Sequence, residues 1–177
     1  MVFLHGIIEN RLDKEYLEKM FASSNPEYNM WAVGFVENHP GFHHDFQQHI
    51  INLVASENEN LARNALKYFR PEYLKDVMIQ KKLTDAIINS TPGIKNNILW
   101  MFIDFKELDA QVILKLLQLF DDSVLVIGDY NLILKLVTTE HIENNHDLIT
   151  RLQGFLSHEN AYIRGITERM LNEKLRL

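Results

Sequence analysis

Residues 157–171, SHENAYIRGITERML, begin with a serine that is followed by His158 and Glu159. A histidine–glutamate pair can supply nitrogen and oxygen ligands to a metal ion. The same kinds of residue also occur at helix starts, where polar side chains accept hydrogen bonds from backbone N–H groups of the first turn. The pair therefore indicates either metal chemistry or a helix start, and the surrounding pattern must decide between them.

A second histidine-rich stretch, HPGFHHDFQQH, spans residues 39–49. Asp45 and His49 are four residues apart, so a helix would place both on one face, where zinc could be held with His39 or His43. His44 would point away from that face, and the stretch is also typical of a turn followed by the polar first turn of a helix. We favour a solvated turn, keep a metal site as the alternative, and predict no bound metal.

Two tryptophans, Trp31 and Trp100, could form an aromatic stripe together with Tyr68 and Tyr130. Such a stripe would stack on bases or grip a peptide. Aromatic residues at helical spacing more often belong to a core, and we favour that interpretation here. Trp31 and Trp100 remain candidate contacts for a partner.

The sequence contains no pattern typical of an enzyme. None of the 177 residues is a cysteine, which rules out disulfides, thiolate zinc sites and cysteine nucleophiles. A glycine-rich phosphate loop, a G-x-S-x-G motif and an H-E-x-x-H motif are all absent. We therefore predict a protein without catalytic residues and without a cofactor.

The formal net charge is −6, and the charge is unevenly distributed. Residues 61–82 contain six basic and two acidic residues, whereas residues 102–150 contain three lysines and nine acids. Nucleic acid is disfavoured as a partner, because phosphate binding requires a surplus of Lys and Arg. The acidic half favours a basic protein or peptide instead. Its candidate contacts are Asp121, Asp122, Asp129, Glu140 and Glu143.

The N-terminal stretch MVFLHGII is apolar but lacks a basic leader and a small-residue cleavage site. No stretch of the sequence approaches the roughly 20 uninterrupted apolar residues that a membrane span needs. We therefore expect a soluble, cytoplasmic protein that does not bind membranes. The apolar stretch is expected to fold back on the first helices or to contact another chain.

Five short polar segments mark the starts of helices. SSNPEYN, SENENLA, NSTPGIK, FDDSVLV and SHENAYI each place capping residue types before an apolar run with helical spacing. Five further helices fit between these starts, over residues 13–21, 43–55, 72–89, 106–120 and 143–156. Alignment of the five segments puts Trp31, Arg63, Lys95, Ile127 and Arg164 in one column, with steps of 32, 32, 32 and 37 residues.

An even period of two antiparallel helices is typical of an α-solenoid, in which neighbouring pairs stack to bury a continuous core. We predict an all-α fold, a right-handed α-solenoid (α-α superhelix) of about five antiparallel helix pairs. Residues 1–177 would form a single repeat domain. A four-helix bundle with extra helices is the alternative, but a bundle gives no reason for evenly spaced helix starts.

The segments ENLARNALKYF and NAYIRGITERML resemble the second helix of a HEAT-type repeat of the armadillo/HEAT class. Arg63 and Arg164 match the arginine of that motif, and Asn60 and Asn160 lie near its usual aspartate. Three aligned positions depart from the arginine: Trp31, Lys95 and Ile127. The resemblance implies a solenoid fold, and solenoids present a long face for recognition. We therefore predict a non-enzymatic protein-interaction module, for example an inhibitor or immunity-type protein that blocks a basic toxin.

HEAT-like iron hydroxylases carry several His-Glu pairs at the place of His158-Glu159, as a di-iron centre requires. Only one of the five aligned positions in this chain holds such a pair, so we interpret His158 and Glu159 as helix-start residues. HEAT-like DNA glycosylases offer the alternative function of nucleic-acid binding or base excision. In that case Trp100, Asp104 and the basic residues of 61–82 would contact the DNA.

Overall fold

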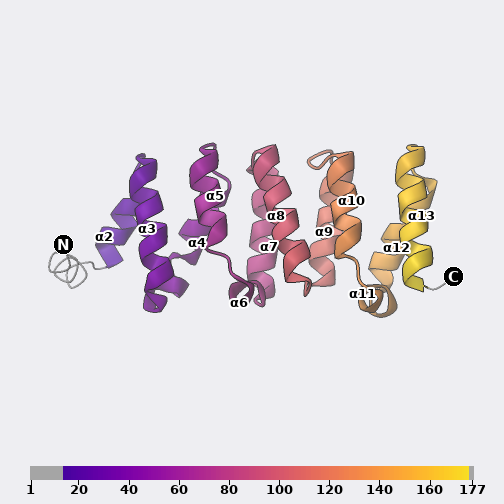
Figure 1. Cartoon of the computed structure of the whole chain (residues 1–177), viewed down its shortest axis with the longest axis horizontal. Helices are drawn as coiled ribbons and strands as arrows, with labels where there is room; N and C mark the ends of the chain where they lie inside the picture. The colour runs from indigo at the N-terminus through magenta and orange to yellow at the C-terminus, as the bar shows by residue number, and fades with distance from the viewer. Residues whose placement is uncertain (1–13, 176–177) are drawn as a thin grey trace. The chain divides into compact units, whose positions relative to one another are not determined.

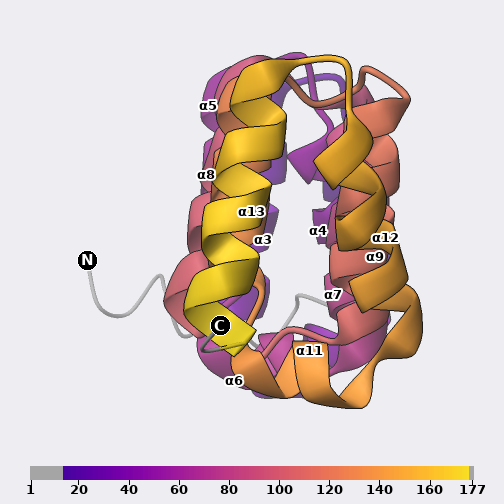
Figure 2. The same ribbon diagram turned by 90° about the vertical axis from the view of Figure 1, so that its right-hand side faces the viewer.

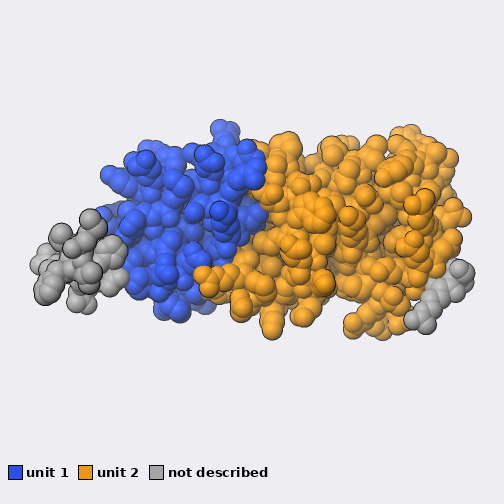
Figure 3. Space-filling model, viewed as in Figure 1, with its two compact units in different colours: residues 1–68 blue, residues 69–177 orange. Residues whose placement is uncertain are grey.

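The computed structural model describes residues 14–175, and every regular element in this range is a helix. The described residues contain no β-strand, which confirms the predicted all-α fold. The chain divides into two compact units, residues 1–68 and 69–177 (Figure 3). A single domain over residues 1–177 stays a prediction. The apolar stretch at residues 1–8 lies outside the described residues.

The described residues of unit 1, 14–68, form four α-helices. They are α2 (Lys14–Phe21), α3 (Pro26–Asn38), α4 (His43–Val54) and α5 (Glu59–Lys67), with the short 3-10 helix η1 (Pro40–Phe42) before α4. Helices α3 and α5 lie side by side, and α4 lies opposite them (Figure 2). Leu17, Phe46 and Ile50 are fully buried between these helices. Their spacing follows the apolar periodicity of the sequence.

Unit 2 contains eight α-helices and two short 3-10 helices among its described residues. They are α6 (Pro71–Leu74), α7 (Val77–Ala86), η2 (Ile87–Asn89), α8 (Pro92–Phe105), α9 (Ala110–Asp121), α10 (Ile127–Leu136), α11 (Thr139–Asn144), α12 (His146–Gly154), η3 (Phe155–Ser157) and α13 (Ala161–Leu175). Helices α8, α10 and α13 form one layer, and α7, α9 and α12 form a second (Figures 1 and 2). Helices α6 and α11 lie across one end of the two layers (Figure 2). None of the described helices combines the length and the apolar character that a membrane crossing requires.

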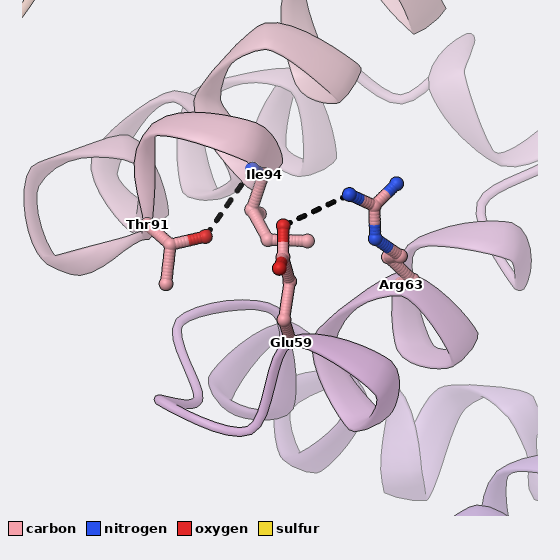
Figure 4. A network of polar contacts seen from close by, with 4 residues as sticks. All are labelled: Glu59, Arg63, Thr91 and Ile94. Atoms are coloured by element: carbon pink, nitrogen blue, oxygen red, sulfur yellow. Dashed lines mark hydrogen bonds and ion pairs between the residues drawn. The ribbon is translucent and has the colours of Figure 1, made fainter.

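The predicted polar segments cap the first turns of α3, α5 and α8 through side-chain hydrogen bonds. The side-chain oxygens of Asn25, Asn58 and Thr91 accept hydrogen bonds from first-turn N–H groups, at 3.0, 3.1 and 3.4 Å. Figure 4 shows the Thr91 cap of α8, and also an ion pair within α5 between Glu59 and Arg63. These side chains satisfy backbone donors that a helix start leaves without partners.

The start of α10 differs from the prediction. Asp121, Asp122 and Ser123 end α9 and form the following turn, in which Ser123 has a φ of 60°. Helix α10 begins only at Ile127, and the carboxylate of Asp129 accepts the N–H of Val126 at 2.9 Å. The prediction was wrong here because Asp121 and Asp122 are typical capping residues by type. The carboxylate that caps α10 instead belongs to Asp129, inside the helix.

Three of the predicted intervening helices are broken or shortened. Asp76 caps α7 and separates it from α6, so residues 72–89 are not one helix. In the same way Asn145 caps α12 and separates it from α11 within residues 143–156. The interval 106–120 begins late, because Lys106 ends α8 with a φ of 66° and Asp109 caps α9. Apolar periodicity continues through these breaks, so only the capping side chains mark them.

Side chains join the turns at one end of unit 2. The buried amide of Gln80 donates to the carbonyls of Leu74 and Glu107, at 2.8 and 3.3 Å, and accepts the N–H of Asp109 at 2.9 Å. His141 accepts the N–H of Thr138 through Nδ1 at 3.2 Å, so its Nε2 donates to the carbonyl of Leu108 at 2.8 Å. The turn between α8 and α9 is therefore held from α7 on one side and from α11 on the other.

Candidate protein-binding surfaces

The two tryptophans are exposed, whereas the two tyrosines that were grouped with them are buried. Trp31 and Trp100 keep 42% and 44% of their surface accessible, and Tyr68 and Tyr130 keep none. The prediction that all four belong to the core is therefore wrong for the tryptophans. Large aromatic side chains that remain exposed are typical contacts for a partner.

Trp31 belongs to a row of rings along α3. Tyr28, Trp31, Phe35 and His39 are separated by three, four and four residues, so they lie on one face of the helix. The rings of Trp31 and Phe35 stack with centroids 5.3 Å apart, and those of Phe35 and His39 stack at 3.8 Å. Tyr28 is 52% exposed, while Phe35 is buried beneath its neighbours. We call these four residues the aromatic ridge.

The aromatic ridge is held at both ends of α3. Asn25 caps the first turn, with Pro26 at the first helical position. At the other end, Nδ1 of His39 lies 2.7 Å from the carbonyl of Phe35 and bonds to it, which fixes the imidazole on the ring of Phe35. The rings are thus ordered before any partner arrives, which lowers the entropic cost of binding.

Three of the predicted acidic contacts lie near the turn between α9 and α10. Asp121 forms an ion pair with Arg151 of α12. Asp129 uses its carboxylate to cap α10, and Asp122 is exposed at the end of α9. Two of these three carboxylates therefore serve local structure.

Glu140 and Glu143 lie elsewhere, on α11 at the opposite end of α10. Because Asp129 is the third of the ten residues of α10 and each residue rises by 1.5 Å, about 10 Å of helix separates this end from Asp129. The hydrogen bond from His141 to Leu108 brings Glu107 into the neighbourhood of Glu140. Glu107, Glu140 and Glu143 are all exposed, and we call them the acidic edge. Glu107 escaped the sequence analysis because its proximity to Glu140 depends on a contact between residues 33 positions apart.

The histidines of residues 39–49 contact different neighbours. His43 lies edge-on to Tyr68, with ring centroids 5.6 Å apart, and His49 lies beside Phe21 and Phe46. The carboxylate of Asp45 pairs with Lys14 at 3.2 Å. Within residues 14–175, no three His, Asp or Glu side chains converge as metal ligands.

His158 and Glu159 lie in the turn that precedes α13. The Nδ1 atom of His158 accepts the N–H of Asn160 at 3.0 Å, and Arg164 donates to the carbonyls of His158 and Glu159 at 2.7 and 2.9 Å. The pair therefore acts in the start of the helix, as interpreted from the sequence. A cavity of about 390 Å³ adjoins this turn, and Asp121, Arg151, Phe155 and His158 are among its lining residues. Arg151 pairs with Asp121 and lies 5.5 Å from the centroid of Phe155, so these lining groups already engage one another.

Comparison of the chain with models of known protein families, with curated proteins and with solved structures found no match.

Proposed function

We propose that this chain is a non-enzymatic protein-interaction module, built from HEAT-like repeats of a right-handed α-solenoid, and that its partner is a basic protein or peptide. The aromatic ridge carries this proposal. Trp and Tyr contribute more than other residues to binding energy at protein interfaces, and both stand exposed on one face of a capped helix. An ordered, exposed aromatic face suits recognition of a protein surface.

The repeat part of the proposal is supported by the local structure within each unit. Helices α3 and α5 in unit 1, and α8 and α13 in unit 2, begin at the recurring polar segments. Arg164 donates to the turn before its own helix, whereas Arg63 pairs with Glu59 on α5. The two arginines that match the HEAT-like motif thus fasten helix starts in different ways.

The acidic edge supports a basic partner. Its three exposed carboxylates attract cations, and the net charge of −6 adds to that attraction at long range. Such charges mainly accelerate association and select against acidic competitors. An inhibitor or immunity-type protein that blocks a basic toxin is one form of this function.

Capture of a partner from native cell extract tests the aromatic ridge. The immobilised wild-type chain should retain a protein from the extract. The Trp31→Ala variant should bind that protein at least about tenfold more weakly, because a central aromatic contact is removed. Tyr162→Ala is the matched control, since Tyr162 on α13 is 53% exposed and lies outside the ridge. Equal retention by both variants would contradict a role for the ridge.

Salt dependence tests the acidic edge. Capture should weaken as NaCl rises, and Glu140→Gln with Glu143→Gln should reduce both the affinity and its salt dependence. The control is Glu15→Gln with Glu18→Gln on α2, which makes the same change in net charge at exposed residues that do not belong to the acidic edge. If both double variants respond alike, only the overall charge matters.

Among the described residues, the ion pair of Arg63 disfavours the alternative function, nucleic-acid binding or DNA glycosylase activity. This arginine of the basic segment is paired with Glu59, and the ring of Trp100 is in contact with the ammonium of Lys135. A gel shift with duplex DNA at about 50 mM salt distinguishes this alternative from the proposed function, because even non-specific DNA-binding proteins retain affinity at that salt concentration. A shift at micromolar protein would favour this alternative over the proposed function.

A further inference from the structure

We propose that a groove between α10 and α13 binds an acidic peptide segment that carries an apolar side chain. The groove lies within unit 2 and has a volume of about 340 Å³. It is distinct from the aromatic ridge and from the acidic edge, so the inference does not depend on the proposed function.

The floor of the groove is apolar. Leu134 of α10 and Ile166 and Met170 of α13 line it. Leu134 and Met170 keep only 4% and 8% of their surface accessible, so they form a fixed base rather than projecting into solvent. Methionine adapts to differently shaped partners because its side chain is flexible and polarisable. This floor suits one or two aliphatic side chains.

The rim of the groove is basic. Lys135, Arg169 and Lys174 line it, and Glu173 is the acidic residue among the lining groups. Within the described part of the chain, none of the three cations forms an ion pair. The rim therefore offers positive charge to an incoming group in a protein whose overall charge is negative.

Trp100 of α8 does not line the groove but contacts Lys135 of its rim. The ammonium of Lys135 lies 5.1 Å from the centroid of the Trp100 ring, which holds the lysine by a cation–π contact. Lys135 is thereby positioned between an exposed aromatic ring and the groove. A carboxylate bound to Lys135 would still leave the ring available for an apolar contact.

These features favour a peptide over a nucleic acid. The rim does not distinguish the two, because Lys135, Arg169 and Lys174 attract phosphates and carboxylates alike and Glu173 repels both. The apolar floor does distinguish them, since a polar sugar–phosphate chain has no branched aliphatic side chain to bury against Leu134 and Met170. An acidic peptide satisfies both parts of the groove, because carboxylates pair with the rim while an apolar side chain covers the floor.

Fluorescence anisotropy with labelled probes tests the inference. The probe is a peptide of alternating Glu and Asp with one central Leu, and it is compared with the same peptide carrying Ser in place of Leu. We expect the wild-type chain to bind the leucine peptide about tenfold more tightly, because burial of the side chain is lost with serine. A dT oligonucleotide of equal length is the nucleic-acid probe.

Charge reversal then locates the site. Lys135→Glu with Arg169→Glu should weaken peptide binding at least about tenfold, because two attractive pairs become repulsive. Lys75→Glu with Lys81→Glu is the control, since both lysines are exposed in unit 2 outside the groove. Helix content by circular dichroism confirms that each variant folds.

Several outcomes would overturn the inference. Equal weakening by both double variants would show that net charge alone controls binding. Absence of peptide binding, or indifference to the leucine, would remove the acidic apolar segment as the occupant. If the oligonucleotide binds more tightly than the peptide, and Lys135→Glu with Arg169→Glu abolishes that binding, the groove is assigned to nucleic acid.

Discussion

Single buried polar residues decide how the turns of unit 2 are held. Gln80 is 1% exposed, and its amide satisfies two carbonyls and one N–H of other segments. A buried backbone group without a partner costs free energy that folding must recover elsewhere. Such a residue stabilises the fold mainly because its removal would leave several buried backbone groups without a hydrogen-bond partner.

Gln80→Leu should therefore destabilise the protein by about 3 kcal/mol, because three backbone groups lose their partner at once. Thr84→Val is a suitable control: Thr84 is equally buried, but its hydroxyl donates only to the carbonyl of Gln80, at 2.8 Å. The control should cost about 1 kcal/mol. Urea unfolding gives both free energies. Equal losses would show that the Gln80 network contributes little.

Because of Tyr130, the free energy of unfolding should depend on pH in the alkaline range. Burial raises the pKa of its phenol to about 12. Thr167 donates to the carbonyl of Ile163, so the phenol is the donor in the 2.6 Å bond between the two hydroxyls. The unfolded chain releases this proton near pH 10, earlier than the folded protein does.

The resulting stabilisation is fully present below pH 10 and is lost as the pH rises from 10 towards 12. Two pKa units correspond to about 3 kcal/mol. The free energy of unfolding should therefore fall more steeply over this range in the wild type than in Tyr130→Phe. Parallel pH profiles of the two proteins would contradict the assignment.

At the scale of elements, the ends of the helices explain both the success and the errors of sequence reasoning. Polar segments before α3, α5, α8 and α13 identified their starts, because capping depends on local sequence alone. Asp76 and Asn145 are equally good caps, but they interrupt apolar patterns that continue on both sides. A prediction from apolar periodicity therefore joins α6 to α7 and α11 to α12, which are separate helices in the structure.

The exposure of Trp31 was predictable from the alignment of the five polar segments, whereas that of Trp100 was not. Trp31 aligns with Arg63, Lys95, Ile127 and Arg164, and three charged residues among five aligned positions indicate a solvent-facing position. The column of Trp100 mixes buried Tyr68 and Leu132 with exposed Arg169, so alignment could not decide. The groove between α10 and α13 depends on packing between helices, which no local pattern encodes.

Lys106 offers a test at the end of α8. Its φ of 66° and ψ of −17° fall in the left-handed region, where glycine has no side-chain penalty. Lys106→Gly should stabilise the protein by about 0.5–1 kcal/mol in thermal or urea unfolding. Lys115→Gly, inside α9, should instead destabilise it by about 1 kcal/mol. A loss of stability in Lys106→Gly would contradict strain at this cap.

At the scale of the whole molecule, each compact unit contains one tryptophan, Trp31 in unit 1 and Trp100 in unit 2. The variants Trp100→Phe and Trp31→Phe therefore report on units 1 and 2 separately. We expect different urea midpoints, with the smaller unit 1 unfolding first, because a smaller unit buries less apolar surface. Coincident fluorescence and circular dichroism curves would instead show one cooperative transition.

The hydrogen bonds of Gln80 and His141 also limit how this protein can change in length. Both side chains bond to backbone groups of residues 107–109, so an insertion there would move these hydrogen-bond partners out of reach. One added amino acid would then uncouple α7 and α11 from the turn together. A change of chain length at this turn is therefore expected to destabilise the protein, whereas an exchange of exposed side chains there keeps both connections.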